Sequence, residues 1–263
     1  MEIRSLGYRT DLFFSRFEGL VLDREDYRVI LTPSNPNFYW GNYLLFANPP
    51  GPGDLENWQA LFQQEIRARQ EAHHTVFAWD APGGELGAVQ PFLDAGFQLV
   101  ESVVLTAGAV HPPQKYNQQV NVRPLVEDWE WELALANQVE CRSPVHSLES
   151  YLPFKMAKMQ RYREMQRAGM GAWFGAFLGD RLVADLGLFC VDGVGRFQSV
   201  ETHPDFQRQG ICGALVHQAA RYGFERMGAK TLVMVADEHY HAARIYESVG
   251  FAPAERQVGL ERW

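Results

Sequence analysis

The stretch Gln207-Arg208-Gln209-Gly210-Ile211-Cys212-Gly213 lies between a predicted strand ending at Thr202 and a predicted helix. The first backbone N–H groups of a helix have no partner within the helix, and the helix dipole adds a partial positive charge there. Gly210 and Gly213 would let the backbone approach phosphate oxygens closely, and Arg208 could donate a charged hydrogen bond to one of them. The stretch therefore predicts an anion site that suits a pyrophosphate.

Two other phosphate-binding motifs do not fit this stretch. A P-loop needs Gly-Lys-Ser/Thr, and a dinucleotide-binding fold needs a third glycine and an acidic residue about 20 positions further on. A glycine pair that opens a helix can also be only a tight connection, and this alternative stays open.

The chain around this stretch alternates predicted strands and helices, which is typical of an α/β domain. Gly179-Asp180 and Asp192-Gly193 are turn pairs that predict hairpins between three antiparallel strands. The expected elements are strands at 121–125, 171–178, 182–190, 196–202, 231–236 and 257–261, and helices at 127–141, 153–168, 211–227 and 241–249. We expect a mixed, mainly antiparallel sheet flanked by helices. On the helix at 211–227, Leu215, Ala219 and Tyr222 have the spacing of one buried face.

The first half of the chain repeats part of the second. Phe92-Leu-Asp-Ala-Gly-Phe97 parallels Tyr246-Glu-Ser-Val-Gly-Phe251, and each follows a predicted buried strand, at 75–79 and at 231–235. A repeat of this length predicts a duplicated domain. Chance recurrence of a short Gly-Phe turn is the alternative. We expect two similar domains in tandem, at residues 1–115 and 118–263.

Two motifs in the second half carry a family resemblance. Gln207-x-x-Gly210 is followed by Cys212 at the second small position, with Gly213 one place later, and Ala242-x-x-x-Tyr246-x-x-x-Gly250-Phe251 closes a short helix. Over about 145 residues the chain resembles the GNAT superfamily of N-acetyltransferases. The resemblance implies a GNAT-like α+β fold. It also implies transfer of an acetyl group from acetyl-CoA to a primary amine of a small molecule or peptide, by direct attack in a ternary complex.

The resemblance also implies roles for particular residues. Tyr246 matches the tyrosine near the CoA sulfur, and a phenol can serve as general acid for the departing thiolate. A backbone N–H near Glu201-Thr202, where the fourth strand splays, would meet the acyl carbonyl. The residues expected to bind the cofactor are Val200, Glu201, Thr202, Gln207, Arg208, Gln209, Gly210, Ile211, Cys212, Gly213, His239, Ala242 and Tyr246.

The general base is less clearly marked. Glu201 is the only carboxylate on its predicted strand, but alternation puts it on the face opposite Val200 and Thr202 unless a bulge intervenes. Asp237, Glu238 and His239 follow the next strand and could act through a water. We take Glu201 as the candidate base and leave the others open.

The first domain lacks the features of the phosphate loop. The corresponding place reads Ala47-Asn-Pro-Pro-Gly-Pro-Gly-Asp54, and proline has no N–H to offer. Asp54 is expected to cap the following helix, so that its carboxylate occupies the anion position and repels a phosphate. The buried face of that helix is predicted to hold Trp58, Leu61, Phe62 and Ile66. We expect a GNAT-like domain that binds no CoA and either walls the acceptor pocket of the second domain or pairs subunits in a homodimer.

Two further segments are expected to be structural. Asp237 to His241 could suggest a metal site, but His239 and His241 would diverge at the start of a helix, so no metal is expected. The helix at 153–168 is predicted to carry a solvated basic face over a methionine-rich inner face. Its basic residues are Lys155, Lys158, Arg161, Arg163 and Arg167, and its apolar ones are Phe154, Met156, Met159, Tyr162 and Met165.

Composition excludes several classes of partner. A formal net charge of -8 and a pI near 5.5 disfavour nucleic acid and suit a cationic amine. Three cysteines at scattered positions favour a reducing cytoplasm over a disulfide framework, and we expect no membrane partner because no run of about 18 apolar residues occurs. A sensor or scaffold that binds acyl-CoA without turnover, and transfer of a longer acyl group, remain the alternative functions.

Overall fold

The computed structural model describes residues 1–237 and 242–263 and divides into two compact units. One unit contains Met1–Val104 together with Ala254–Trp263, and the other contains Leu105–Pro253. The sequence suggested domains at 1–115 and 118–263. The contacts differ from that division at the C-terminus, because the last strand packs within the first unit.

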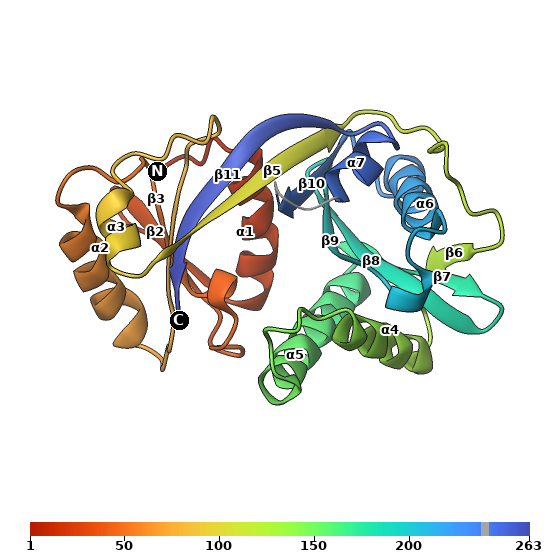
Figure 1. The fold of residues 1–263 in the computed structure, drawn as a ribbon, viewed down its shortest axis with the longest axis horizontal. Helices are drawn as coiled ribbons and strands as arrows, with labels where there is room; N and C mark the ends of the chain where they lie inside the picture. Colours follow the sequence, from red (N-terminus) through yellow and green to blue (C-terminus); the bar gives the residue numbers. More distant parts are fainter. Residues whose placement is uncertain (238–241) are drawn as a thin grey trace. The chain divides into compact units, whose positions relative to one another are not determined.

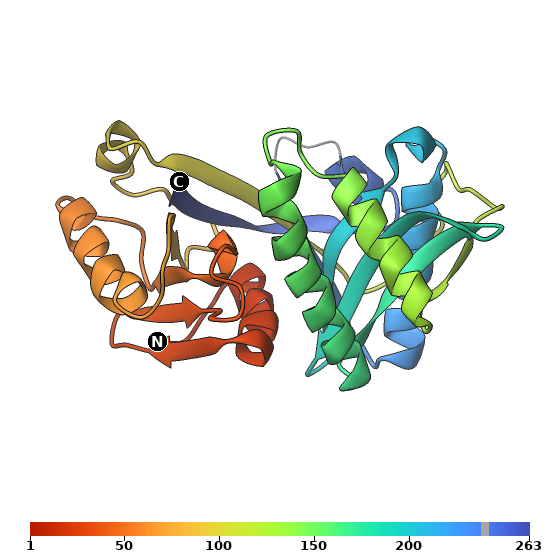
Figure 2. The ribbon, with the colours of Figure 1, turned by 90° about the horizontal axis from the view of Figure 1, so that it is seen from below.

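The second unit has the mixed sheet expected from its sequence. Its strands lie in the order β10-β9-β8-β7-β6; β9 and β10 are parallel, and the other neighbouring pairs are antiparallel. Helices α4 and α5 cover one face of this sheet and α6 covers the other (Figures 1 and 2). In chain order the elements are β6 (Asn121–Pro124), α4 (Asp128–Glu140), α5 (Leu148–Arg167), β7 (Gly171–Leu178), β8 (Arg181–Val191), β9 (Val194–Thr202), a 3-10 turn (Pro204–Phe206), α6 (Ile211–Arg226), β10 (Thr231–Asp237) and α7 (Ala242–Glu247).

Helix α5 begins earlier than predicted. Ser147 is its N-cap and accepts a hydrogen bond from the backbone N–H of Ser150, so Pro153 lies inside the helix and not at its start. The prediction treated the proline as a starting residue because proline is favoured in the first turn. The hydroxyl cap of Ser147 is the stronger start signal here.

The predicted basic face of α5 is solvated only in part: Arg167 is exposed, but two of its lysines are buried. Lys155 and Lys158 are each only 6% exposed, whereas Met156 is 51% exposed. Met159, Tyr162 and Met165 are buried, as expected. Two ammonium groups are therefore turned inward, and a buried charge requires a polar or charged partner close by.

Helix α6 packs with a slightly different face from the predicted one. Leu215 and Ala219 are fully buried, but Tyr222 is 36% exposed. Gly223 is the buried neighbour instead, and a Cβ there would lie 2.9 Å from Cδ2 of Leu188. The absence of a side chain at Gly223 thus lets the helix approach strand β8 closely.

The first unit repeats the strand order of the second. Strands β2 and β3 are antiparallel and β3 and β4 are parallel, like β8, β9 and β10. A helix connects each parallel pair, which confirms two similar domains in tandem. The strand order is β1-β2-β3-β4-β11-β5. The elements are α1 (Leu6–Glu18), β1 (Leu20–Asp23), β2 (Tyr27–Leu31), a 3-10 turn (Tyr39–Gly41), β3 (Tyr43–Phe46), α2 (Asp54–Phe62), a π-helical turn (Gln63–Arg67), β4 (Thr75–Trp79), α3 (Gln90–Asp94), β5 (Gln98–Ala107) and β11 (Ala252–Arg262).

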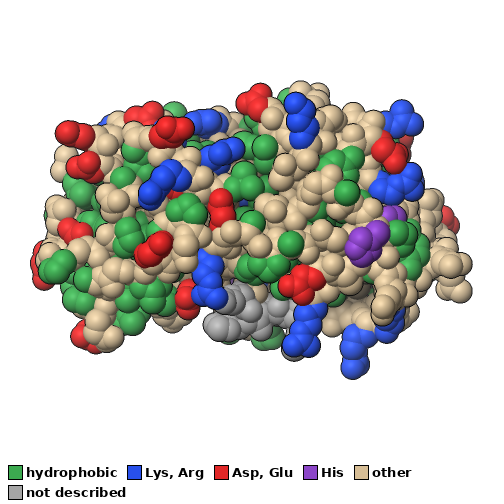
Figure 3. All heavy atoms as spheres, turned by 90° about the horizontal axis from the view of Figure 1, so that it is seen from above, with side chains coloured by type: hydrophobic (Ala, Val, Ile, Leu, Met, Phe, Trp, Pro, Cys, Tyr) green, Lys and Arg blue, Asp and Glu red, His purple; other side chains and the backbone are tan. Residues whose placement is uncertain are grey.

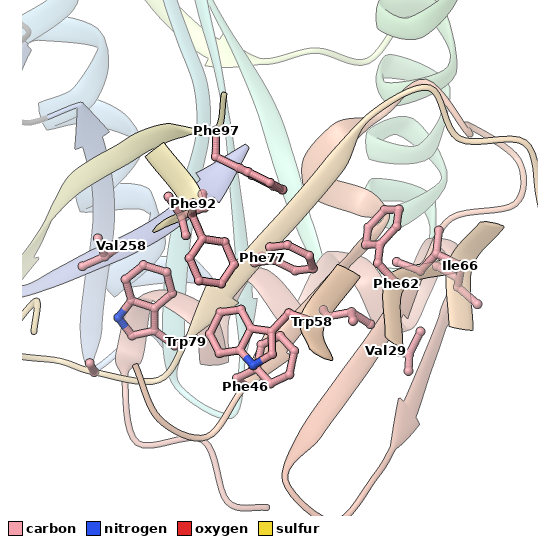
Figure 4. Close-up of a cluster of buried hydrophobic side chains, with 14 residues drawn as sticks. Val29, Phe46, Trp58, Phe62, Ile66, Phe77, Trp79, Phe92, Phe97 and Val258 are labelled. Atoms are coloured by element: carbon pink, nitrogen blue, oxygen red, sulfur yellow. The ribbon is translucent and has the colours of Figure 1, made fainter. Parts of the chain in front are cut away.

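An aromatic cluster forms the core of the first unit (Figure 4). Phe46 stacks on Trp58 with ring centroids 3.7 Å apart, and Phe77, Phe92 and Phe97 contact one another. Trp58 belongs to the predicted face of α2, of which Phe62 and Ile66 are also buried and Leu61 is partly buried. Phe92 and Phe97 come from the repeated motif, so the repeat marks core positions.

Strand β11 completes the sheet of the first unit. It pairs antiparallel with β4, with Gly259 opposite Ala78. The hydroxyl of Tyr8 donates to the carbonyl of Val258 over 2.5 Å, and the backbone N–H of Leu6 donates to the carboxylate of Glu255 over 2.6 Å. The C-terminal residues therefore contribute both sheet and helix contacts to the N-terminal unit.

Asp54 does not cap α2 as predicted. The N-cap is Gly53, and Asp54 is the first residue of the helix. Its carboxylate accepts a hydrogen bond from the backbone N–H of Gly51 over 2.7 Å. A negative charge thus lies at this helix start, as expected, but it bonds the preceding loop because the glycine takes the cap position.

The surface carries charges of both signs. Acidic and basic side chains are interspersed over the face shown in Figure 3. Within residues 1–237 and 242–263, no helix combines the length and apolarity needed to cross a membrane.

Candidate functional site

A cavity of about 560 Å³ lies in the second unit. Its walls come from the end of β9, the loop that leads into α6, the start of α6, helix α7 with the residue after it, and the segment before β6. The lining residues are Pro113, Lys115, Val200, Glu201, Thr202, Phe206, Gln207, Arg208, Gly210, Ile211, Cys212, Gly213, Ile245, Tyr246 and Ser248.

Most residues expected to bind a cofactor meet at this cavity. Among the described residues, Gln209 does not line it. The side chain of Gln209 donates to the carbonyl of Asp205 over 3.2 Å. Ala242 is the first residue of α7. His239 lies outside the described residues, as does Glu238.

The start of α6 is the candidate anion site. Its N-cap is Gly210, with φ +77°, a conformation that glycine adopts without strain, and the first-turn N–H groups of a helix have no partner within the helix. Arg208 is also in the left-handed region, at φ +58°, and its side chain is exposed. A non-glycine residue held there costs about 1–2 kcal/mol, which is tolerated where it serves a site.

The segment Pro113 to Asn117 packs against this loop, a feature that the sequence did not indicate. A Cβ at Gly213 would lie 2.9 Å from Cγ of Pro113, and one at Gly210 would lie 2.9 Å from the carbonyl oxygen of Lys115. The two glycines therefore make room for this segment of the chain. The ammonium of Lys115 donates to the carbonyl of Arg208, which brings a second cation to the cavity.

A bulge in β9 brings Glu201 to the cavity. Asp185 is opposite Glu201, but Gly187 is opposite Gln198, so β9 has one residue more than β8 over this interval. Ser199 lies within the bulge, with φ +45°. An extra residue resets the alternation of side chains. With such a bulge Glu201 can face the same side as Val200 and Thr202, and all three residues line the cavity.

The parallel pairing of β9 with β10 stops before the cavity. The paired residues of β9 and β10 run from Val194 and Thr231 to Arg196 and Val233. Both strands then continue, to Thr202 and to Asp237. The part of β9 that lines the cavity thus lies beyond the paired interval.

Glu201 and Lys155 form an electrostatic pair. Burial raises the pKa of Glu201 to about 7, and the charge of Lys155 acts in the opposite direction. Burial lowers the pKa of Lys155 to about 8, against the charges of Glu201 and Asp185. A carboxyl with a pKa near neutrality, on the wall of a cavity, fits the requirement for a general base.

A buried hydrogen-bond network supports this pair. Asp185 is fully buried and accepts from Asn137 over 2.7 Å, from Gln138 over 2.7 Å and from Trp173 over 2.9 Å. The oxygen of the Gln138 amide accepts from the Lys155 ammonium over 2.8 Å. Burial raises the pKa of Asp185 to about 7, although the three donated hydrogen bonds favour its ionised form.

Tyr246 lines the same cavity from α7. Its side chain is only 5% exposed. Tyr246 and Glu201 come from different elements and line one cavity, which places a phenol and a carboxyl on its wall.

Two cysteine thiols near the site are held in the protonated state. Burial, followed by the charge of Glu201, raises the pKa of Cys141 to about 12. Burial likewise raises the pKa of Cys212 to about 12, while the nearby Thr202 side chain acts in the opposite direction. A thiol with such a pKa is a poor nucleophile at neutral pH, because the thiolate is the reactive form.

The fold and the cavity together define an α/β domain with a glycine-capped helix start beside the end of a parallel strand. Residues 133–251 match the model of the acetyltransferase (GNAT) family. The second unit is therefore a GNAT domain, and the resemblance found in its motifs is confirmed.

Solved structures show the same fold over both units. A functionally unknown conserved protein from Staphylococcus epidermidis has a TM-score of 0.73 at 15% identity, covering 94% of each chain. A GCN5-related N-acetyltransferase from Kribbella flavida has a TM-score of 0.68 at 15% identity, covering 98% of this chain and 96% of its own. A tandem GNAT protein from the clavulanic acid biosynthesis pathway has a TM-score of 0.54 at 12% identity, covering 90% and 78%. Identities this low show the fold alone. No curated protein matches the sequence.

Proposed function

We propose that the second unit is an N-acetyltransferase that moves an acetyl group from acetyl-CoA to a primary amine of a small molecule or peptide. The observation that carries the proposal is the common cavity of Glu201, the start of α6 and Tyr246. This cavity would bring together a base, an anion-binding site and an acid. The membership of residues 133–251 in an acetyltransferase family supports the same reaction class.

The residues present fit acetyl-CoA as the co-substrate. The first-turn amides of α6 would hold the pyrophosphate, and Lys115 and Arg208, which line the same cavity, would add positive charge. When bound, acetyl-CoA supplies the activated acetyl group as a thioester. The backbone near Glu201 and Thr202 would provide the N–H that stabilises the developing oxyanion.

Glu201 and Tyr246 would divide the proton transfers. Glu201 would accept the proton of the attacking amine, for which a pKa of about 7 is well matched to neutral pH. Tyr246 would donate a proton to the departing thiolate. Asp237 remains the alternative base, acting through a water.

Direct attack by the amine is favoured over a covalent acyl-enzyme. The cysteine that lines the cavity is Cys212, whose pKa of about 12 leaves roughly one thiol in 10⁵ ionised at pH 7. A nucleophile so rarely ionised would be slow to take up the acyl group. The amine therefore attacks within a ternary complex.

We further propose that the first unit binds no CoA. The carboxylate of Asp54 lies at the start of α2, the counterpart of α6, where it would repel a phosphate. We also propose a cytoplasmic location, which the three free cysteines suit. Nucleic acid and membranes are not proposed as partners.

Release of free thiol from acetyl-CoA, measured across a panel of amines, tests the function. We expect thiol release that depends on a primary amine and yields one acetylated product by mass spectrometry. Protection by CoA against heating without turnover on any amine would favour an acyl-CoA sensor. Faster turnover with longer acyl-CoA esters would favour a different acyl group.

A further inference from the structure

Lys155 is a buried cation, and the proposed function gives it no role. It lies on α5, is 6% exposed, and carries an ammonium in a region that also contains two carboxylates. Burying a charge is costly unless it is paired and hydrogen-bonded. The position of Lys155 therefore has to be explained by what its ammonium contacts.

Gln138 fixes the ammonium of Lys155 and the bulge of β9 at the same time. Its amide oxygen accepts from Lys155 Nζ over 2.8 Å. Its amide nitrogen donates to the carbonyl of Ser199 over 2.8 Å and to the carboxylate of Asp185 over 2.7 Å. Ser199 lies two residues before Glu201 in the bulge that turns Glu201 to the cavity. One side chain thus links the lysine to the backbone that positions the candidate base.

We propose that Lys155 is a positioning residue for acetyl transfer: held by Gln138 beside the β9 bulge, its ammonium keeps the Glu201 carboxylate ionised and ready to accept the amine's proton. This inference rests on the proposed function, because it assigns Lys155 a role through the candidate base.

The charges around the pair favour this role. Lys155 faces Glu201 on β9, Asp185 on β8, Lys158 on its own helix and Cys141 after α4. For Glu201, burial raises the pKa and the charge of Lys155 lowers it. Asp185 is held by three donors, so Glu201 is the carboxylate left to face the cavity.

A titration of the Glu201 carboxyl tests the inference without an acceptor. The whole protein, labelled with ¹³C at glutamate side chains, is titrated by NMR, and the Glu201 signal is assigned by its loss in Glu201→Gln. In Lys155→Met we expect the midpoint to move to higher pH by about one pH unit or more, because an opposite charge nearby is lost. Lys155→Arg keeps the charge and should restore a midpoint near that of the wild type.

Lys158→Met is the matched control, since Lys158 is a lysine of the same helix with the same 6% exposure. We expect its Glu201 midpoint to stay near the wild-type value, because Lys158 does not act directly on the pKa of Glu201. If Lys155→Met fails to fold by near-UV circular dichroism, Lys155→Gln replaces it. An unchanged Glu201 midpoint in the folded variant overturns the inference.

Kinetics then separate this inference from the proposed function. With an accepted amine, the acidic limb of the kcat/KM profile should move with the NMR midpoint in Lys155→Met, while the affinity for CoA stays within about twofold. A limb that does not follow the midpoint overturns the positioning role. If the wild type transfers no acetyl group, the proposed function fails, whereas the NMR titration still reports on the Lys155–Glu201 pair.

Discussion

Asp185 on β8 and Glu201 on β9 are direct partners across the two strands. Burial raises the pKa of each to about 7, and Lys155 interacts with both. The two carboxyls differ in their surroundings, since Asp185 is enclosed by three N–H donors and Glu201 lines the cavity. One is therefore expected to act in stability and the other in chemistry.

Asp185→Asn is expected to destabilise the protein by about 2–4 kcal/mol, because an amide N–H₂ would then face a donor in a buried network. Urea unfolding at pH 7.5 measures the change. Glu132→Asn, on the exposed side of α4, is the control and should change the unfolding free energy by less than about 0.5 kcal/mol. Equal stabilities of the two variants would contradict the prediction.

Glu201→Gln is expected to lower kcat by about 10² to 10⁴, since the amide cannot accept the proton of the amine. Its CoA affinity should stay within about twofold, measured by calorimetry. In the wild type, activity should rise as pH increases through about 7, because the ionised carboxylate is the active form. Full activity in Glu201→Gln would show that Glu201 is not the general base and would favour Asp237 in that role.

Tyr246→Phe should lower turnover more than CoA affinity, because the hydroxyl acts on the leaving thiolate and the ring keeps its packing. Tyr222→Phe, on the partly exposed face of α6, serves as the control and should retain turnover. If Tyr246→Phe equals the wild type in turnover at every pH, Tyr246 is not the general acid.

Lys115→Met is expected to weaken CoA binding by about tenfold, since a hydrogen bond to a charged group is lost. The loss should diminish at high salt, where charges are screened. Lys230→Met removes a lysine from an exposed position away from the cavity and should bind CoA normally. Equal CoA affinities for the two variants would remove Lys115 from the cofactor site.

Gly210→Ala should destabilise the protein more than Gly179→Ala. Both glycines have positive φ, which costs an alanine about 1–2 kcal/mol. At Gly210 the new Cβ would also lie 2.9 Å from the carbonyl of Lys115, whereas at Gly179 it meets nothing within 4 Å. Thermal unfolding separates the two contributions, and CoA affinity should fall in Gly210→Ala alone. Equal shifts in Tm for the two variants would show that the segment around Lys115 moves to make room for the new methyl group.

Much of the fold was predictable from sequence because turn pairs and periodic apolar residues are local signals. Strand β7 has the predicted bounds, and the Gly-Phe repeat correctly indicated a duplicated domain. The start of α5 was misplaced because Pro153 was given more weight than the hydroxyl cap of Ser147. The cap of α2 was assigned to Asp54 because a glycine cap leaves no side-chain signal.

The site was predictable in its motifs and not in its electrostatics. The stretch from Gln207 to Gly213 and Tyr246 have a recognisable spacing, and both line the cavity. The bulge at Ser199 has no marker in the sequence, since it depends on the hydrogen bond from Gln138. Lys155 and Lys158 were expected in solvent because lysines on a helix usually are. Their burial depends on partners far away in the sequence, such as Gln138 for Lys155.

The pairing of β11 with β4 has a consequence for biosynthesis. Residues 252–262 emerge from the ribosome long after Trp79, yet they occupy the place beside β4 in the N-terminal sheet. The first unit to be translated is thus the later one to be completed, which reverses the usual N-to-C order of domain folding. Until then the edge of β4 is exposed to pairing with other chains, a hazard that a chaperone would reduce and slow translation would prolong.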